Sequence, residues 1–141
     1  MKFITSSPYQ TKMLAKAFAS ALPAGSVILA YGELGSGKTA FAKGIALALH
    51  VRDVVNSPTF NIIKFYPGKP LDFYHIDAYR LEGRNDDIGF TDFIGKEENI
   101  TYIEWPDVLN DYYKNVKHLY KLVIDYIDLN KRQIEIVEVK Q

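Results

Sequence analysis

A short segment with two fixed glycines, a lysine and a hydroxyl residue constrains this chain more than any other feature. It has the Walker A pattern and reads Gly32-Glu33-Leu34-Gly35-Ser36-Gly37-Lys38-Thr39. The continuous apolar run at residues 27–31 before it is typical of a strand buried on both faces. After it, apolar residues recur at helical spacing from Phe41 to Leu49. A phosphate-binding loop needs this context of strand, loop and helix.

Each chemical role in such a loop has a residue that fits it. Glycines let backbone N–H groups curl around phosphate oxygens, and the positive end of the following helix points at the same anion. We expect Lys38 to reach the β- and γ-phosphates and the Thr39 hydroxyl to bind Mg²⁺. The predicted nucleotide-binding residues are Gly32, Glu33, Leu34, Gly35, Ser36, Gly37, Lys38, Thr39 and Ala40.

P-loop hydrolases also hold the metal with a carboxylate, usually at the end of another buried strand. Glu104 directly follows the strand-like segment 100–103 and is the first candidate. Asp77 is its rival, and it could bind the metal through water or position the attacking water. Lys38, Asp77 and Glu104 are therefore the predicted catalytic residues. His75 is expected to be a packed strand residue rather than a ligand.

Two further segments bear on the nucleotide. Thr59, in Ser57-Pro58-Thr59, follows the predicted P-loop helix and could reach the γ-phosphate or the metal, as switch segments do. A plain turn is the simpler interpretation of those three residues alone. Residues 130–133 begin like the Asn-Lys-x-Asp guanine reader of GTPases, but they lack the Asp and lie in an expected hairpin turn. The sequence therefore favours ATP over GTP.

Composition limits the remaining possibilities. The 141 residues suit one domain, 1–141. Seventeen Lys and Arg balance 17 Asp and Glu, so the chain lacks the basic surplus on which standalone binding of nucleic acids or anionic membranes depends. The absence of cysteine excludes disulfides and thiolate chemistry. With no signal-peptide pattern and no apolar run of the roughly 18 residues that a membrane span needs, we expect a cytoplasmic protein without membrane association.

Local patterns predict the other elements. Ser7 before Pro8 begins a helix, which ends before Pro23. Gly44 lies inside the P-loop helix, where only a close packing contact would justify it. Strands are expected at 59–66, 71–76, 100–103, 118–127 and 133–139, with short helices within 83–95 and 106–113.

Four segments occur together in a distinctive order and spacing. They are the Walker A segment, Ser57-Pro58-Thr59-Phe60, His75-Ile76-Asp77-Ala78-Tyr79-Arg80-Leu81 and Ile103-Glu104-Trp105-Pro106. In this combination the chain resembles the TsaE (YjeE) family of small bacterial P-loop ATPases, over essentially its whole length. The second and third motifs after Walker A, His-x-Asp-x-Tyr-Arg and Glu-Trp, are far more specific than Walker A itself.

The resemblance implies a fold and a function. The fold would be a three-layer α/β P-loop domain with a mostly parallel central sheet and antiparallel hairpins. The protein would be the ATPase that is needed, together with TsaD and TsaB, to make N6-threonylcarbamoyladenosine in tRNAs that read ANN codons. Its cofactors would be ATP and Mg²⁺, and tRNA would be contacted only indirectly, through the complex.

The resemblance also assigns roles to residues. Thr59 would be the switch-like threonine, and Glu104 the second metal ligand beside Thr39. Tyr79 and Arg80 would line the nucleotide or partner surface. Trp105 would face a partner or close the site.

Two other classes of function remain open. A small P-loop kinase of a nucleoside or small molecule shares Walker A but usually needs an arginine cluster, and Arg occurs here only at positions 52, 80, 84 and 132. A nucleotide-gated binding module would bind without turnover. Because no arginine finger or water-orienting Gln is recognisable, we expect slow hydrolysis by the chain alone and stimulation by partners.

Overall fold

The computed structural model describes residues 1–58, 61–83 and 88–139, so the switch candidate Thr59 lies outside the described residues. The strands are β1 (Lys2–Thr5), β2 (Val27–Tyr31), β3 (Ile63–Tyr66), β4 (Asp72–Asp77), β5 (Asn99–Glu104), β6 (Leu119–Tyr126) and β7 (Arg132–Val139). The helices are α1 (Pro8–Ala19), α2 (Lys38–Ala48), α3 (Phe90–Phe93) and α4 (Asn110–Tyr113), with 3₁₀ segments η1 (Tyr79–Leu81) and η2 (Pro106–Leu109).

The seven strands form one mixed sheet in the order β1-β7-β6-β2-β5-β4-β3. Its four central strands, from β6 to β4, are parallel, whereas β1, β7 and β3 join antiparallel at the two sides. The expected α/β fold with a parallel central sheet and antiparallel hairpins is confirmed. Because parallel strands share a direction, the carboxyl ends of β6, β2, β5 and β4 all lie at one edge of the sheet.

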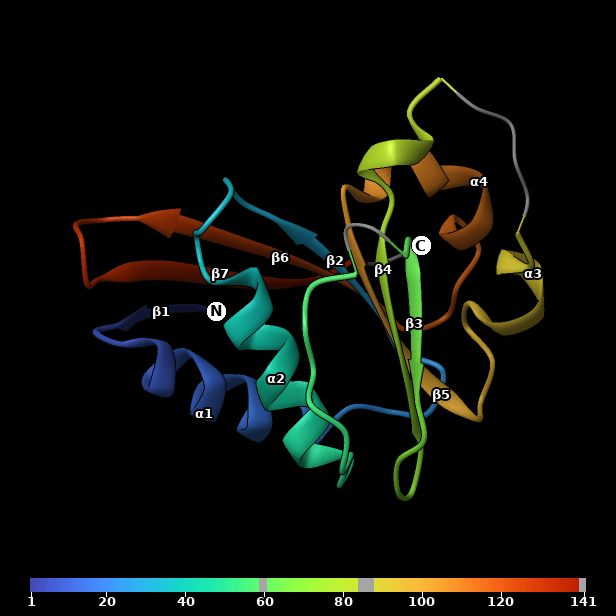
Figure 1. The fold of residues 1–141 in the computed structure, drawn as a ribbon, viewed down its shortest axis with the longest axis horizontal. Coiled ribbons are helices and arrows are strands. Elements are labelled where there is room, and N and C mark those ends of the chain that lie inside the picture. The colour runs from blue at the N-terminus through green and yellow to red at the C-terminus, as the bar shows by residue number, and fades with distance from the viewer. Residues whose placement is uncertain (59–60, 84–87, 140–141) are drawn as a thin grey trace.

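Helices cover both faces of this sheet and complete the three layers (Figure 1). On one face, α1 and α2 pack side by side over aliphatic and aromatic side chains. Their contact is close at Gly44, where a Cβ atom would lie 2.1 Å from the Lys12 carbonyl oxygen and 2.5 Å from the Ala15 Cβ. The expected packing reason for this glycine is confirmed. On the other face, the short helices α3 and α4 cover the sheet.

The N-terminal region combines one predicted element with one that the sequence patterns missed. Helix α1 begins as expected, because the Ser7 hydroxyl accepts a hydrogen bond from the Gln10 N–H at 3.1 Å. Strand β1 was not predicted. It is a short edge strand with only Thr5 buried, and its partner β7 lies at the other end of the chain. None of the described helices has the length and apolarity to cross a membrane.

Candidate functional site

The Walker A loop connects the carboxyl end of the central strand β2 to the first residue of α2. Its first glycine is required by space, because a Cβ atom on Gly32 would lie 2.6 Å from the Ser36 Oγ and 2.7 Å from the Ile124 carbonyl oxygen. Gly37 precedes α2 and gives the helix no side-chain cap. The first N–H groups of α2 and its positive dipole end therefore face the loop, as an anion-binding site requires.

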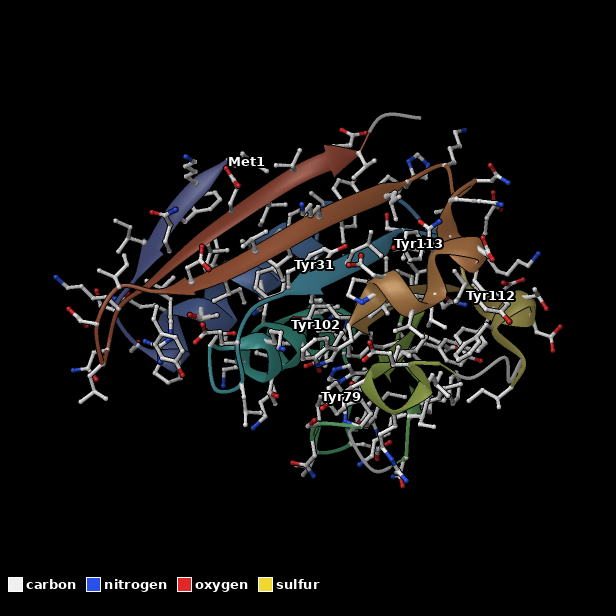
Figure 2. The ribbon with its side chains drawn as sticks, turned by 90° about the horizontal axis from the view of Figure 1, so that it is seen from above. Met1, Tyr31, Tyr79, Tyr102, Tyr112 and Tyr113 are labelled. Carbon is white, nitrogen blue, oxygen red and sulfur yellow. The ribbon has the colours of Figure 1, made fainter. Side chains whose placement is uncertain are left out.

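Lys38, at the start of α2, is held by hydrogen bonds of its side chain and of its backbone carbonyl group. Its Nζ donates a hydrogen bond to the Gly32 carbonyl oxygen at 2.7 Å, and its own carbonyl oxygen accepts one from the Tyr102 hydroxyl at 2.8 Å. Burial, and secondarily the nearby Glu104 charge, raises the pKa of Tyr102 well above its usual value. The hydroxyl therefore stays protonated and keeps donating. In Figure 2, Tyr102 lies beside α2 in the interior of the molecule.

The two predicted carboxylates come together at the same edge. Asp77 ends β4, Glu104 ends β5, and the two are register partners. Side chains alternate along a strand, so His75 and Asp77 on β4, and Tyr102 and Glu104 on β5, project toward the α2 face. Both carboxylates are only 5% exposed.

Glu104 has a different contact at each of its oxygens. Oε1 lies 3.8 Å from the Lys38 Nζ, and Oε2 lies 2.6 Å from the His75 Nε2. Lys38, Asp77 and Glu104 are the only Lys, Asp or Glu residues that are buried in the described part of the chain. Buried charge is thus concentrated at the carboxyl edge of the sheet, beside the P-loop.

A cavity of about 690 Å³ lies over this edge. Its lining combines the P-loop, both carboxylates and two aromatic rings. The lining residues are Leu34, Gly35, Gly37, Lys38, Thr39, Ser57, Asp77, Tyr79, Glu104 and Trp105. The predicted site residues that the structure describes therefore converge on one cavity, with the exceptions given below.

Tyr79 and Trp105 form the aromatic part of this cavity. Their ring centroids are 4.9 Å apart, and both side chains are about half exposed. Tyr79 is the first residue of η1 and is labelled in Figure 2. The Lys38 Nζ lies 5.7 Å from the Trp105 ring centroid. Trp105 has a left-handed backbone with φ of 55°, a conformation that costs energy in a residue with a side chain and clusters at functional sites.

Some predicted residues lie outside the cavity lining. Arg80 is exposed in η1 and does not line the cavity. Of the P-loop residues, Gly32, Glu33, Ser36 and Ala40 do not line it either, and Ser36 is fully buried beneath the loop.

Sequence reasoning missed the contribution of the β6–β7 hairpin. Strand β6 continues past the end of β2, and the Tyr126 hydroxyl donates to the Leu34 carbonyl oxygen at 3.2 Å. Arg132 donates through Nε to the Ser36 carbonyl oxygen at 2.9 Å, and its guanidinium lies 4.2 Å from the Tyr126 ring centroid. The expected turn at 128–131 is present. No sequence pattern indicated that this hairpin supports the P-loop.

The residues present fit Mg²⁺ by their chemistry. Mg²⁺ prefers oxygen ligands and is usually held by one or two carboxylates together with substrate phosphates and water. The Thr39 hydroxyl and the Glu104 carboxylate supply such oxygens, and both residues line the cavity together with Lys38. No group of three or more metal-binding side chains occurs among the residues described, so a metal cage made by the protein alone is not found there.

A glycine-rich loop between a central parallel strand and a helix, with acidic side chains at the ends of the neighbouring strands, defines a P-loop protein of the nucleotide-binding class. The family model described as "Threonylcarbamoyl adenosine biosynthesis protein TsaE" matches residues 5–134. The chain therefore belongs to the TsaE family, as the motifs predicted.

Individual relatives agree with this assignment. The chain is 38% identical over 111 residues to the tRNA threonylcarbamoyladenosine biosynthesis protein TsaE of Bacillus subtilis, covering 79% of this chain and 70% of that protein. It is 35% identical to the TsaE of Aquifex aeolicus, covering 94% and 92% of the two chains. The crystal structure of YdiB from Bacillus subtilis superposes with a TM-score of 0.82 at 28% identity, covering 99% of this chain and 86% of that one.

Proposed function

We propose that this chain is a Mg²⁺-dependent ATPase that acts in the N6-threonylcarbamoyladenosine modification of tRNAs that read ANN codons. One observation carries the ATPase part: the buried Lys, Asp and Glu of the described structure all lie beside the P-loop. Burying such groups is costly, so their concentration in one cavity favours a chemical role over a structural one. The pathway is supported by the family and by the names of the relatives.

The proposed reaction is in-line attack of water on the γ-phosphorus of ATP, which breaks the bond from that phosphorus to the β,γ-bridging oxygen and releases ADP and phosphate. Lys38 and the P-loop N–H groups neutralise phosphate charge, while Thr39 and Glu104 hold the metal. Mg²⁺ supplies further charge neutralisation at the phosphate oxygens when it is bound. Asp77 accepts a hydrogen bond from the Tyr79 N–H at 3.0 Å, which fixes its carboxylate at the cavity wall. There it positions the attacking water or contacts the metal through water.

We propose TsaD and TsaB as partners, with tRNA bound by the complex rather than by this chain. The rings of Tyr79 and Trp105 support a partner surface, because they are half exposed at the mouth of the cavity. A partner that covers them would exclude water from the carboxylates below. The zero formal net charge favours indirect contact with tRNA.

The test measures phosphate release from ATP by this chain alone, with TsaB, with TsaD and with both. We expect slow turnover alone and a clear rise with both partners, since a completed P-loop site can gain about 10³-fold or more in rate. Lys38→Ala should weaken ATP binding by about 10- to 100-fold through loss of a charge-assisted hydrogen bond. Lys43→Ala, at an exposed position of the same helix, is the matched control.

Three results would contradict the proposal. The first is fast turnover by the isolated chain that partners do not change. The second is Lys38→Ala binding ATP as tightly as Lys43→Ala does. The third is transfer of the γ-phosphate to a nucleoside in place of release, which would favour the small P-loop kinase.

A further inference from the structure

His75 is a fully buried histidine that makes a short contact with a site carboxylate. Its Nε2 lies 2.6 Å from the Glu104 Oε2, and the side chain is 0% exposed. The rest of its surroundings are aromatic. The imidazole stacks on Phe73 with ring centroids 6.0 Å apart and meets the edge of Tyr102 at 5.2 Å. The ring is therefore fixed in one orientation by packing.

Packing alone does not explain a histidine at this position. Its Nδ1 is buried and has no hydrogen-bond partner among the described residues, which carries an energetic cost. A purely apolar side chain would fill the same aromatic surroundings without that cost. The gain from histidine at position 75 is therefore the hydrogen bond that Nε2–H donates to Glu104.

Because of that hydrogen bond, the two oxygens of Glu104 have different roles. Oε2 is fixed by His75 on the interior side, and Oε1 is left on the side of the P-loop, 3.8 Å from the Lys38 Nζ. A glutamate side chain has several rotatable bonds, and holding it in one rotamer costs entropy unless a neighbour fixes it. His75 supplies this neighbour from the adjacent parallel strand β4.

We propose that His75 is a positioning residue for Glu104, which it holds with Oε1 directed toward the metal. This inference rests on the proposed metal role of Glu104. Partners that orient a ligating carboxylate typically change metal affinity by about 10- to 100-fold when they are removed. His75 itself touches neither nucleotide nor metal in this proposal.

The test uses two amides that differ in reach. His75→Gln places an N–H donor near the position of Nε2, whereas the shorter His75→Asn places it nearer to Nδ1. The readout is the Mn²⁺ affinity of the chain with a non-hydrolysable ATP analogue, measured by electron paramagnetic resonance. We expect His75→Gln to stay within about 3-fold of the wild type and His75→Asn to lose about 10- to 100-fold.

Two controls separate this role from packing and from the proposed function. Ile76→Val alters a fully buried residue on the opposite face of β4 from the His75 ring, and should leave Mn²⁺ affinity unchanged. Glu104→Gln should lower Mn²⁺ affinity. If it does not, the metal role of Glu104 fails. If Glu104→Gln lowers the affinity but His75→Asn does not, or if Ile76→Val lowers it as much as His75→Asn, only the role of His75 is overturned.

A spectroscopic measurement on the wild type tests the hydrogen bond itself without metal or activity, so its main result does not depend on whether a variant folds. A short N–H···O contact should give the wild-type His75 imidazole a slowly exchanging, strongly downfield-shifted N–H proton resonance. Glu104→Gln should move that resonance upfield. The absence of a protected imidazole resonance in the wild type would overturn the proposal.

Discussion

Two regions on the same face of the sheet bury different kinds of side chain. One is the contact between α1 and α2, and the other is the carboxyl edge of the sheet. Between the helices, the buried groups are small and apolar side chains around Gly44. At the edge, the buried groups include Lys38, Asp77 and Glu104. Helix α2 belongs to both regions, since its first residue is Lys38 and Gly44 lies in its middle.

The difference shows that two parts of α2 serve different purposes. Its middle stabilises the fold, and its first turn belongs to the nucleotide site. Apolar contact between α1 and α2 stabilises the fold directly, at about 25 cal/mol per Å² of apolar surface removed from water. Buried ion pairs are often neutral or costly, so the polar edge is expected to contribute little to stability. If this comparison holds, substitutions in the helix contact should change the free energy of unfolding, and substitutions at the edge should change nucleotide chemistry.

Gly44→Ala should have the largest effect on stability. The added Cβ meets the Lys12 backbone oxygen, which cannot move without shifting α1. We expect the free energy of unfolding to fall by roughly 3 kcal/mol, the upper end for overpacking, in spite of the better helix propensity of alanine. Urea denaturation measures it, with Lys43→Ala as the exposed control. A Gly44→Ala protein as stable as the control would contradict the close contact.

Glu104→Gln should show the opposite pattern. It removes the charge but keeps the size of the side chain, and the amide oxygen can still accept from His75. We expect Mg²⁺-dependent ATP hydrolysis with partners to fall about 100-fold, which corresponds to ~2.7 kcal/mol of barrier. The free energy of unfolding should change by less than in Gly44→Ala. A Glu104→Gln variant with full activity but lower stability would mean that the carboxyl edge serves stability rather than nucleotide chemistry.

The sequence predicted most of the elements that are marked by residues within or next to the element itself. The glycines of Walker A and the apolar run before it predicted β2 and the start of α2, and both begin where expected. The capping Ser7 predicted α1, and Pro67 with Gly68 predicted the β3–β4 hairpin. Asp77 and Glu104 were expected at strand ends and lie there.

The features that the sequence did not predict depend on contacts between distant segments. Strand β1 pairs with β7, for example Phe3 with Ile134, and neither local pattern indicates the other. The contact of Arg132 with the P-loop needs the length by which β6 passes β2. The contact of His75 with Glu104 depends on the register between β4 and β5. The alternation of apolar and polar residues within one strand does not predict that register.

Arg132→Met tests a third region that links the other two, because the β6–β7 hairpin holds the loop from which α2 starts. The methionine keeps an unbranched apolar stem but loses the hydrogen bond to the Ser36 carbonyl oxygen and the contact of the guanidinium with Tyr126. We expect unfolding to become easier by about 1 kcal/mol and ATP affinity to fall several-fold, since a looser loop must be ordered on binding. Calorimetry and urea denaturation measure both, with the exposed Arg52→Met as control. Loss of stability without any loss of ATP affinity would mean that the hairpin, like the contact between α1 and α2, stabilises the fold but does not support nucleotide binding.

Trp105→Leu should have the smallest effect, and it separates the aromatic cover of the edge from the charges beneath it. The Lys38 Nζ lies 5.7 Å from the Trp105 ring centroid, a geometry typical of a cation–π contact worth about 0.5–1 kcal/mol at an exposed site. We expect ATP affinity to fall about 3- to 5-fold with little change in stability. Tyr9→Leu is a matched control, because Lys12 lies 5.8 Å over this exposed ring on α1, outside the cavity lining.

Trp105 is the single tryptophan of the chain, so its fluorescence reports on the edge directly. In the wild type, an ATP analogue should change the emission, and in Glu104→Gln the same change should require more Mg²⁺. If nucleotide binds without any change in emission, the ring does not cover the bound phosphates, and Trp105 would then act only through the partner surface that it shares with Tyr79. Measuring Trp105→Leu with and without TsaB and TsaD distinguishes the two, because a partner surface would show its loss only in the complex.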